Sequence, residues 1–290
     1  MWSTTSDESN EGPVSRAPRE PGPRSRVALM GVELARLDEA ETIAVVLDAL
    51  DTGRGGWICP VNLDVLRQIV ESDGLRTLVG EADLVVADGM PLLWAARLQG
   101  TPLPGRVTGS SLIWTLSEAL ARCNRSVYLL GGNEGTAQSA GERLEETVTD
   151  FRLAGWFCPP FGFEQSPEQL ERLKSHVIRA EPDVVFVGLG FPKQDRLVVQ
   201  LRHDMPHTWF VSCGISLSFL IGEVQRAPRA MQAVGLEWIH RLAQEPTRLG
   251  RRYLVLGLPF AARLGVSSIR HRAVRMVRAG RESTGAKRRP

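Results

Sequence analysis

Short apolar runs and amphipathic segments alternate along most of the chain. The runs have the length of buried strands, and the segments between them place apolar residues at i, i+3, i+4 and i+7, as helices do. The helix after Asp38, for example, carries Ile43, Val46, Leu47 and Leu50 on one face. We predict strands at 27–32, 57–61, 84–87, 126–130, 153–157, 183–189 and 209–212. Such alternation predicts an α/β fold with a Rossmann-like parallel sheet and helices on both faces.

Both ends of the chain depart from this alternation. Residues 1–25 are rich in Pro, Ser, Gly and charge, and we expect them to be disordered because they cannot bury enough apolar surface. After Gly214 the strand pattern stops, and 228–233, 236–244 and the chain from Arg248 onward look helical. We therefore divide the chain into a disordered segment (1–25), an α/β domain (26–222), a helical appendage (223–253) and a tail (254–290).

Positive charge is concentrated at the C-terminal end. The net charge is +2, but residues 241–290 hold 13 Lys and Arg against Glu245 and Glu282, a local net of +11 that leaves −9 on the rest. Apolar residues such as Ile269, Val274 and Val277 lie among these arginines, which predicts a basic amphipathic helix. We expect it to bind an anionic membrane surface and no nucleic acid; a solvated terminal helix is the alternative.

The cysteines and the apolar runs indicate in which cellular compartment the protein is expected and whether it spans a membrane. The four cysteines are scattered without a Cys-x-x-Cys pair, so we expect no zinc site or disulfide framework and a reducing cytosol. The longest apolar run near the C-terminus, 253–262, contains Gly257 and Pro259 and is about half the ~20 residues that a spanning helix needs. We predict a protein without a transmembrane segment.

Segment 81–94 places an acid where ligands bind in parallel α/β sheets. Its strand, 84–87, delivers Asp88 and Gly89 to a turn, and Pro91 then opens a helix. The carboxyl ends of parallel strands are the usual ligand edge, so Asp88 is a candidate catalytic acid. The alternative is that Asp88 caps the helix, as Asp commonly does.

Two glycine turns follow other predicted strands. Gly131–Gly135 leads from a strand into a helix, an arrangement that binds phosphate, although it matches neither the dinucleotide fingerprint nor the P-loop. The turn at 190–195 brings polar residues to the same sheet edge. Arg106, in the Gly- and Pro-rich loop 100–109, is either a solvated charge or an anion clamp.

Seven stretches, in this order along the chain, resemble the WecG/TagA/CpsF family of bacterial glycosyltransferases (glycosyltransferase family 26). They are 60–64 (PVNLD), 81–89 (EADLVVADG), 103–109 (LPGRVTG), 129–132 (LLGG), 187–194 (VGLGFPKQ), 226–229 (RAPR) and 235–248 (GLEWIHRLAQEPTR). The family moves a hexose-type sugar from a nucleotide diphosphate sugar to a polyprenyl-diphosphate-linked saccharide. The resemblance therefore implies an inverting, metal-independent transferase without cofactor, peripheral on the cytoplasmic face of the plasma membrane.

The resemblance also implies roles for individual residues. Asp88 falls on the proposed general base. The residues that fall on substrate-binding positions are Asn62, Arg106, Gly131, Gly132, Lys193, Gln194, Arg241, Arg248 and Arg251, the last three in an appendage that completes the site. Pro60 stands where the family often has Thr, and Asp195 where it often has Glu. These departures leave the donor sugar open between N-acetylmannosamine, its uronic acid and glucose; the oligomeric state, including a homo-oligomer, also stays open.

The chemistry of the residues agrees with this resemblance. Inverting transfer needs a carboxylate that accepts the proton of the acceptor hydroxyl, for which Asp88 is suitable. The sequence has no Asp-x-Asp motif, so arginines and helix N-termini are the candidates for neutralising a departing diphosphate. A nucleotide-dependent oxidoreductase is one alternative, weakened by the missing G-x-G-x-x-G. A non-enzymatic membrane adaptor is the other.

Overall fold

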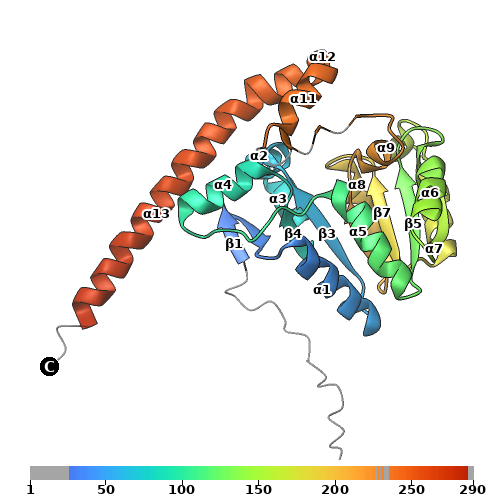
Figure 1. Cartoon of the computed structure of the whole chain (residues 1–290), viewed down its shortest axis with the longest axis horizontal. Coiled ribbons are helices and arrows are strands. Elements are labelled where there is room, and N and C mark those ends of the chain that lie inside the picture. The colour runs from blue at the N-terminus through green and yellow to red at the C-terminus, as the bar shows by residue number, and fades with distance from the viewer. Residues whose placement is uncertain (1–25, 226, 229, 232–234, 287–290) are drawn as a thin grey trace, which may run out of the picture.

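The computed structural model describes residues 26–225, 227–228, 230–231 and 235–286 (Figure 1). The predicted disordered segment 1–25 and part of the predicted helix 228–233 lie outside these residues. The side chains of Arg248 and of residues 278–286 are also outside the described part. Within it, an α/β body carries a long helix, α13, that runs along one side (Figure 1).

The centre of the fold is a six-stranded parallel sheet, which confirms the predicted class. Its spatial order is β4-β3-β8-β7-β5-β6. The strands are β3 (Gly56–Val61), β4 (Leu84–Ala87), β5 (Ser126–Gly131), β6 (Arg152–Phe157), β7 (Val184–Gly188) and β8 (Trp209–Ser212). All five residues of β7 and all four of β8 are buried, as expected for central parallel strands covered on both faces.

Helices cover both faces of this sheet and form two hydrophobic cores. One core receives side chains from α2 (Leu63–Glu71), α4 (Met90–Gln99), α7 (Pro167–Ala180), α8 (Lys193–Asp204) and α13 (Leu258–Ala286). The other receives them from α1 (Glu39–Asp51), α5 (Gly109–Arg122), α6 (Thr136–Thr147) and α9 (Ser216–Leu220). Because all six strands run parallel, every strand delivers its carboxyl end to the same edge of the sheet.

The first apolar run is a hairpin and not a sheet strand. The prediction of one strand over 27–32 is wrong, since β1 (Arg26–Leu29) and β2 (Val32–Ala35) pair antiparallel in a separate two-stranded sheet. The chain reverses at Met30 and Gly31, whose φ angles are 50° and 83°. Positive φ at both central residues is characteristic of a two-residue hairpin turn. A second unpredicted element, α3 (Asp73–Gly80), lies between α2 and β4.

The C-terminal region is helical, as predicted. It comprises α11 (Glu237–Gln244), α12 (Pro246–Gly250), a π-helical turn at Arg251–Gly257 and α13. Helix α13 packs along α4, and its buried residues Phe260, Leu264 and Ser268 recur every four residues, which places them on one helix face. None of the helices in the described part is long and apolar enough to cross a membrane.

Candidate active site

A cavity of about 890 Å³ lies at the carboxyl ends of four adjacent strands, β4, β3, β8 and β7. Its floor includes Asn62 after β3, Asp88 after β4, Gly190 after β7 and Cys213 after β8. Residues of α11, the π-helical turn and α13 complete the wall on the other side. The cavity is therefore lined by residues of both the α/β domain and the C-terminal segments.

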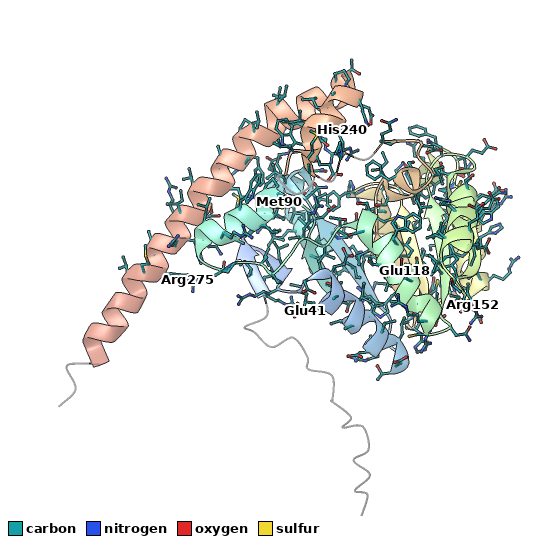
Figure 2. All side chains as sticks on the ribbon, viewed as in Figure 1. Glu41, Met90, Glu118, Arg152, His240 and Arg275 are labelled. Carbon is teal, nitrogen blue, oxygen red and sulfur yellow. The ribbon has the colours of Figure 1, made fainter. Side chains whose placement is uncertain are left out.

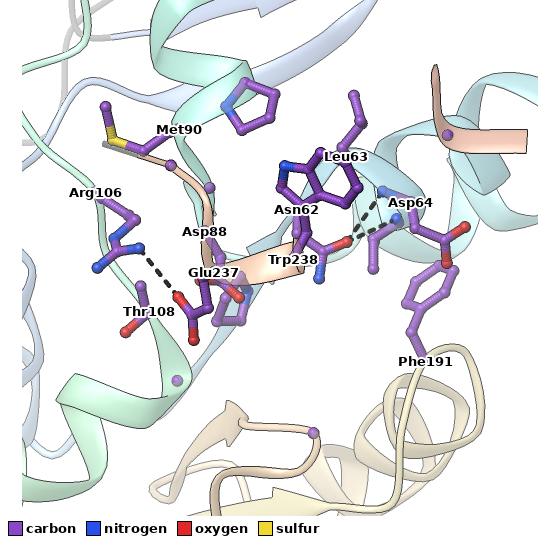
Figure 3. A pocket seen from close by; sticks show the side chains of 18 of the residues that line it. Asn62, Leu63, Asp64, Asp88, Met90, Arg106, Thr108, Phe191, Glu237 and Trp238 are labelled. Carbon is purple, nitrogen blue, oxygen red and sulfur yellow. Dashed lines mark hydrogen bonds and ion pairs between the residues drawn. The ribbon is translucent and has the colours of Figure 1, made fainter. Parts of the chain in front are cut away.

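Asp88 faces this cavity directly after β4 (Figure 3). Its backbone N–H donates to the carbonyl of Val61 at 2.8 Å, which extends the β3–β4 pairing by one step. Helix α4 begins at Met90 with Gly89 as its N-cap residue, so Asp88 lies one residue before the cap position. The alternative role as a helix cap is not supported by this backbone arrangement.

Asn62 lies beside Asp88 because the residues before them, Val61 and Ala87, are paired between β3 and β4. Its side-chain oxygen accepts hydrogen bonds from the backbone N–H groups of Asp64 and Val65, both at 3.1 Å (Figure 3). Asn62 is therefore the N-cap of α2. Capping uses the oxygen and fixes the orientation of the amide at the cavity wall.

Arg106 joins the loop after α4 to the C-terminal region. Its Nη1 lies 3.4 Å from Oε2 of Glu237 in α11 (Figure 3), and about a fifth to a quarter of each side chain is exposed (22% and 24%). Val107, next along the chain, donates its N–H to the carbonyl of Ala87 at 2.9 Å. That bond holds the loop against β4, so the guanidinium is kept at the mouth of the cavity beside Asp88.

Gln194 and Asp195 form the buried part of the floor. The side-chain oxygen of Gln194 accepts from the N–H groups of Gly190 and Gly214, both at 3.1 Å, and so links the turns after β7 and β8. Oδ1 of Asp195 accepts from the Ser212 hydroxyl at 2.8 Å. Its Oδ2 is buried without a hydrogen-bond partner among the described residues. Burial raises the pKa of this carboxyl from 3.8 to about 6, and the hydrogen bonds it accepts oppose the shift.

Two arginines of the C-terminal region line the cavity. Arg241, which the sequence predicts, lies with its guanidinium carbon 5.6 Å from the ring centroid of Phe219. Arg252, which the sequence analysis missed, has its Nε 2.9 Å from Oδ2 of Asp64, although the N–H does not point at that oxygen closely enough for a hydrogen bond. The exposed Arg251 is not among the lining residues.

Arg252 and not Arg251 lines the cavity, although the two are adjacent in the π-helical turn. The packing of that turn against α2 sets which side of it faces the cavity. Sequence spacing gives no signal for this packing. The two adjacent arginines at 251–252 were the feature of the sequence that could have indicated Arg252.

Three other predicted residues lie away from the cavity lining. Gly131 has a φ of 116°, and a Cβ there would lie 2.4 Å from the carbonyl oxygen of Gly188. A Cβ on Gly132 would lie 2.5 Å from the side chain of Thr136. Lys193 pairs with Glu164, Nζ to Oε1 at 2.5 Å, which lowers the pKa of that carboxyl. The two glycines thus have a packing reason to be glycine.

The described residues contain no group of three or more His, Cys, Asp and Glu side chains arranged to hold a metal ion. The cationic groups that line the cavity are Arg106, Arg241 and Arg252. They come from three different segments, and two of them are ion-paired to carboxylates of the protein itself. The arrangement suits binding of a multiply charged oxyanion beside a carboxylate that accepts a proton.

The chain is similar to known proteins over most of its length. A family model described as Glycosyl transferase WecG/TagA/CpsF family matches residues 27–274. A Bacillus spizizenii protein named N-acetylglucosaminyldiphosphoundecaprenol N-acetyl-beta-D-mannosaminyltransferase is 26% identical over 202 residues, which cover 70% of this chain and 76% of that protein. A Bacillus subtilis (strain 168) protein of the same name is 24% identical over 202 residues, 70% of this chain and 77% of that protein. The resemblance predicted from the seven stretches is confirmed.

Proposed function

Because this chain belongs to the WecG/TagA/CpsF family and is therefore a glycosyltransferase, we propose that it moves one hexose-type sugar from a UDP-sugar to a polyprenyl-diphosphate-linked saccharide. The transfer inverts the anomeric centre and uses no metal. The observation that carries the proposal is one cavity that holds the Asp88 carboxylate together with Arg106, Arg241 and Arg252. A base for the acceptor hydroxyl and cations for a departing diphosphate are the two things that such a transfer requires.

In the proposed reaction Asp88 acts on the acceptor hydroxyl. Its carboxylate takes the proton while the hydroxyl oxygen forms a bond to the anomeric carbon of the donor. The bond from that carbon to the UDP oxygen breaks, and UDP leaves with the electron pair. Arg106, Arg241 and Arg252 stabilise the charge that develops on the diphosphate. Asn62, fixed beside Asp88, is placed to orient one of the two sugars.

The names of the relatives favour N-acetylmannosamine as the donor sugar and an N-acetylglucosamine-diphosphoundecaprenol as the acceptor. We propose the corresponding donor class, UDP-N-acetylmannosamine, for this chain. Its uronic acid and UDP-glucose are the alternatives, because Pro60 provides no hydroxyl at a donor-side position where the family often has Thr.

Donor turnover by the full chain and by Asp88→Asn tests this proposal. Both proteins would receive a panel of UDP- and GDP-sugars with a short-chain polyprenyl-diphosphate-N-acetylglucosamine, in EDTA. We expect the wild type to use one donor and Asp88→Asn to be roughly 10²–10⁴-fold slower, the usual contribution of a general base. Equal turnover by both would remove Asp88 from the mechanism. Stabilisation by NAD but not by UDP in a thermal-shift assay would instead favour an oxidoreductase.

We further propose that the protein is peripheral on the inner face of the plasma membrane through α13. Side chains project from the described part of this helix, Arg275 among them (Figure 2). Arg263, Arg270, Arg272 and Arg275 are exposed, as are Val266, Ile269, Val274, Met276 and Val277, a mixture suited to an anionic lipid surface.

Co-sedimentation with vesicles tests this localisation. Binding to vesicles with phosphatidylglycerol should weaken strongly between about 0.1 and 0.5 M salt, because exposed charges are screened over that range. Salt-independent binding would contradict the electrostatic part of the proposal. A non-enzymatic adaptor predicts that Asp88→Asn keeps full activity in cells while removal of 254–290 abolishes it.

A further inference from the structure

One end of the cavity is apolar and open to the surface. There α4 contributes Trp94 and Leu98 and α13 contributes Leu258. These three large apolar side chains are 42%, 44% and 51% exposed. Exposed apolar side chains that line a single concave surface mark a binding site more often than isolated ones do. The apolar end therefore has to be explained separately from the polar floor around Asp88.

Small residues on α13 and at the end of the π-helical turn before it make this end a groove. Gly257 of that turn and Ala261 and Gly265 of α13 all line the cavity, and their four-residue spacing sets them along one side. A Cβ on Gly265 would meet no atom within 4 Å. The space beside α13 is thus empty of protein, and α4 forms its opposite wall. We call this space, between Trp94 and Leu98 on one side and Leu258, Ala261 and Gly265 on the other, the α4–α13 groove.

The groove is continuous with the polar site and with the outer surface of α13. The same cavity contains Asp88 and Arg252 at its polar end. At its open end, Leu258 is followed along α13 by the exposed Val266 and Ile269 and preceded by the exposed Leu254. An apolar chain can therefore run from outside the protein, between the helices, to the cations beside the carboxylate.

We propose that the α4–α13 groove binds the first isoprene units of the acceptor's polyprenyl chain. This inference rests on the proposed function. A polyprenyl chain has no hydrogen-bonding groups, and the side chains of the groove are apolar apart from the indole N–H of Trp94. Its attached diphosphate would then meet Arg252 and Arg241, and the sugar beyond would reach Asp88. The lipid part of the acceptor would thus lie against apolar side chains, and its diphosphate would lie against cationic ones.

Chain-length dependence of turnover tests the groove in the full-length enzyme. The acceptors are N-acetylglucosamine diphosphates on one, three and five isoprene units, all below their critical micelle concentrations. We expect KM to fall at least tenfold from one unit to three, an effect that burial of two methylene groups suffices to produce. Gly265→Phe fills the groove and is compatible with a helix, so it should remove this gain and raise the KM of the three- and five-unit acceptors to that of the one-unit acceptor.

A matched variant and a direct probe separate this inference from the proposed function. Ala262→Phe adds the same side chain to an exposed position of α13 that does not line the cavity, and it should keep the chain-length gain. A benzophenone-bearing farnesyl diphosphate should label peptides containing 94–98 or 258–265 in the wild type and in Ala262→Phe, but not in Gly265→Phe.

Each outcome decides between the two claims. Labelling at the groove that Gly265→Phe abolishes, without turnover of any acceptor, would sustain the groove and refute the proposed function. Turnover with a chain-length gain that survives Gly265→Phe would refute the groove and leave the function intact. Equal labelling by a benzophenone fatty acid would overturn the prenyl assignment in favour of general membrane lipid.

Discussion

Asp195 is predicted to destabilise the folded protein at neutral pH, and Asp195→Asn should reverse the effect. The carboxyl is fully buried, and one of its oxygens has no partner in the described structure. Asn has nearly the same volume, and its side-chain oxygen can still accept the Ser212 hydrogen bond. The substitution removes the negative charge and adds an amide NH2 group, so its main effect is to relieve the cost of burying that charge.

The size of the effect follows from the pKa. Burial raises the Asp195 pKa from 3.8 to about 6, so the folded state binds more protons than the unfolded state between these values. Stability therefore falls as the pH rises through this window and is lowest above about pH 6. About two pH units correspond to roughly 3 kcal/mol. Because the Asn amide nitrogen would also lack a partner, we expect a net gain of roughly 1–3 kcal/mol at pH 7.5.

Thermal unfolding of both proteins at pH 4.5, 6 and 7.5 measures this gain. At pH 7.5 we expect the Tm of Asp195→Asn to be roughly 2–10 °C higher, and the difference should largely disappear at pH 4.5. Asp48→Asn, at an exposed position of α1, controls for the loss of a carboxylate in general. A variant no more stable than the wild type at pH 7.5, or one whose advantage does not shrink on acidification, would refute the reasoning.

Two further predictions concern the cavity and the glycine turn. Glu237→Gln removes the charge that pairs with Arg106 at 3.4 Å and should strengthen UDP binding about 1.4- to 5-fold in calorimetry, since ion pairs that solvent reaches contribute roughly 0.2–1 kcal/mol. Weaker UDP binding would mean that Glu237 helps to form the site. Gly131→Ala places a Cβ 2.4 Å from the Gly188 carbonyl oxygen and should lower the free energy of unfolding in urea by roughly 1–3 kcal/mol. The UDP affinity of the folded protein should not change. A selective loss of UDP affinity would restore the phosphate-binding interpretation of this turn.

The sheet and its ligand edge could be predicted because they depend on local pattern. Apolar runs such as 184–188 identify buried strands, and in a parallel sheet their ends must meet at one edge. Asn62 and Asp88 lie together for that reason alone. The N-terminal hairpin could not be predicted in the same way, because Met30 rarely adopts a positive φ and so gives no turn signal. The apolar run therefore predicted one strand where the chain forms two.

The cation set of the site depended on long-range packing and was only partly predictable. Arg106 and Arg241 line the cavity and could be selected from the motif stretches. Arg252 could not, since the packing of the π-helical turn against α2, and not sequence spacing, decides which of two neighbouring arginines faces inward. The glycine turn at 131–132 shows the opposite difficulty: its sequence suits phosphate, but close approach to Gly188 and Thr136 gives each glycine a packing reason.

Two ion pairs join the C-terminal segments to the α/β domain at the cavity itself. Arg106 with Glu237 connects the loop after α4 to α11, and Arg252 with Asp64 connects the π-helical turn to α2. The same two guanidinium groups are among the three candidates for binding a diphosphate. A ligand diphosphate must therefore compete with Glu237 and Asp64 for them, so binding at the site and the attachment of the C-terminal helices are energetically coupled. Since α13 is also the proposed membrane-binding element, this coupling would make the state of the cavity sensitive to whether the protein is on the membrane.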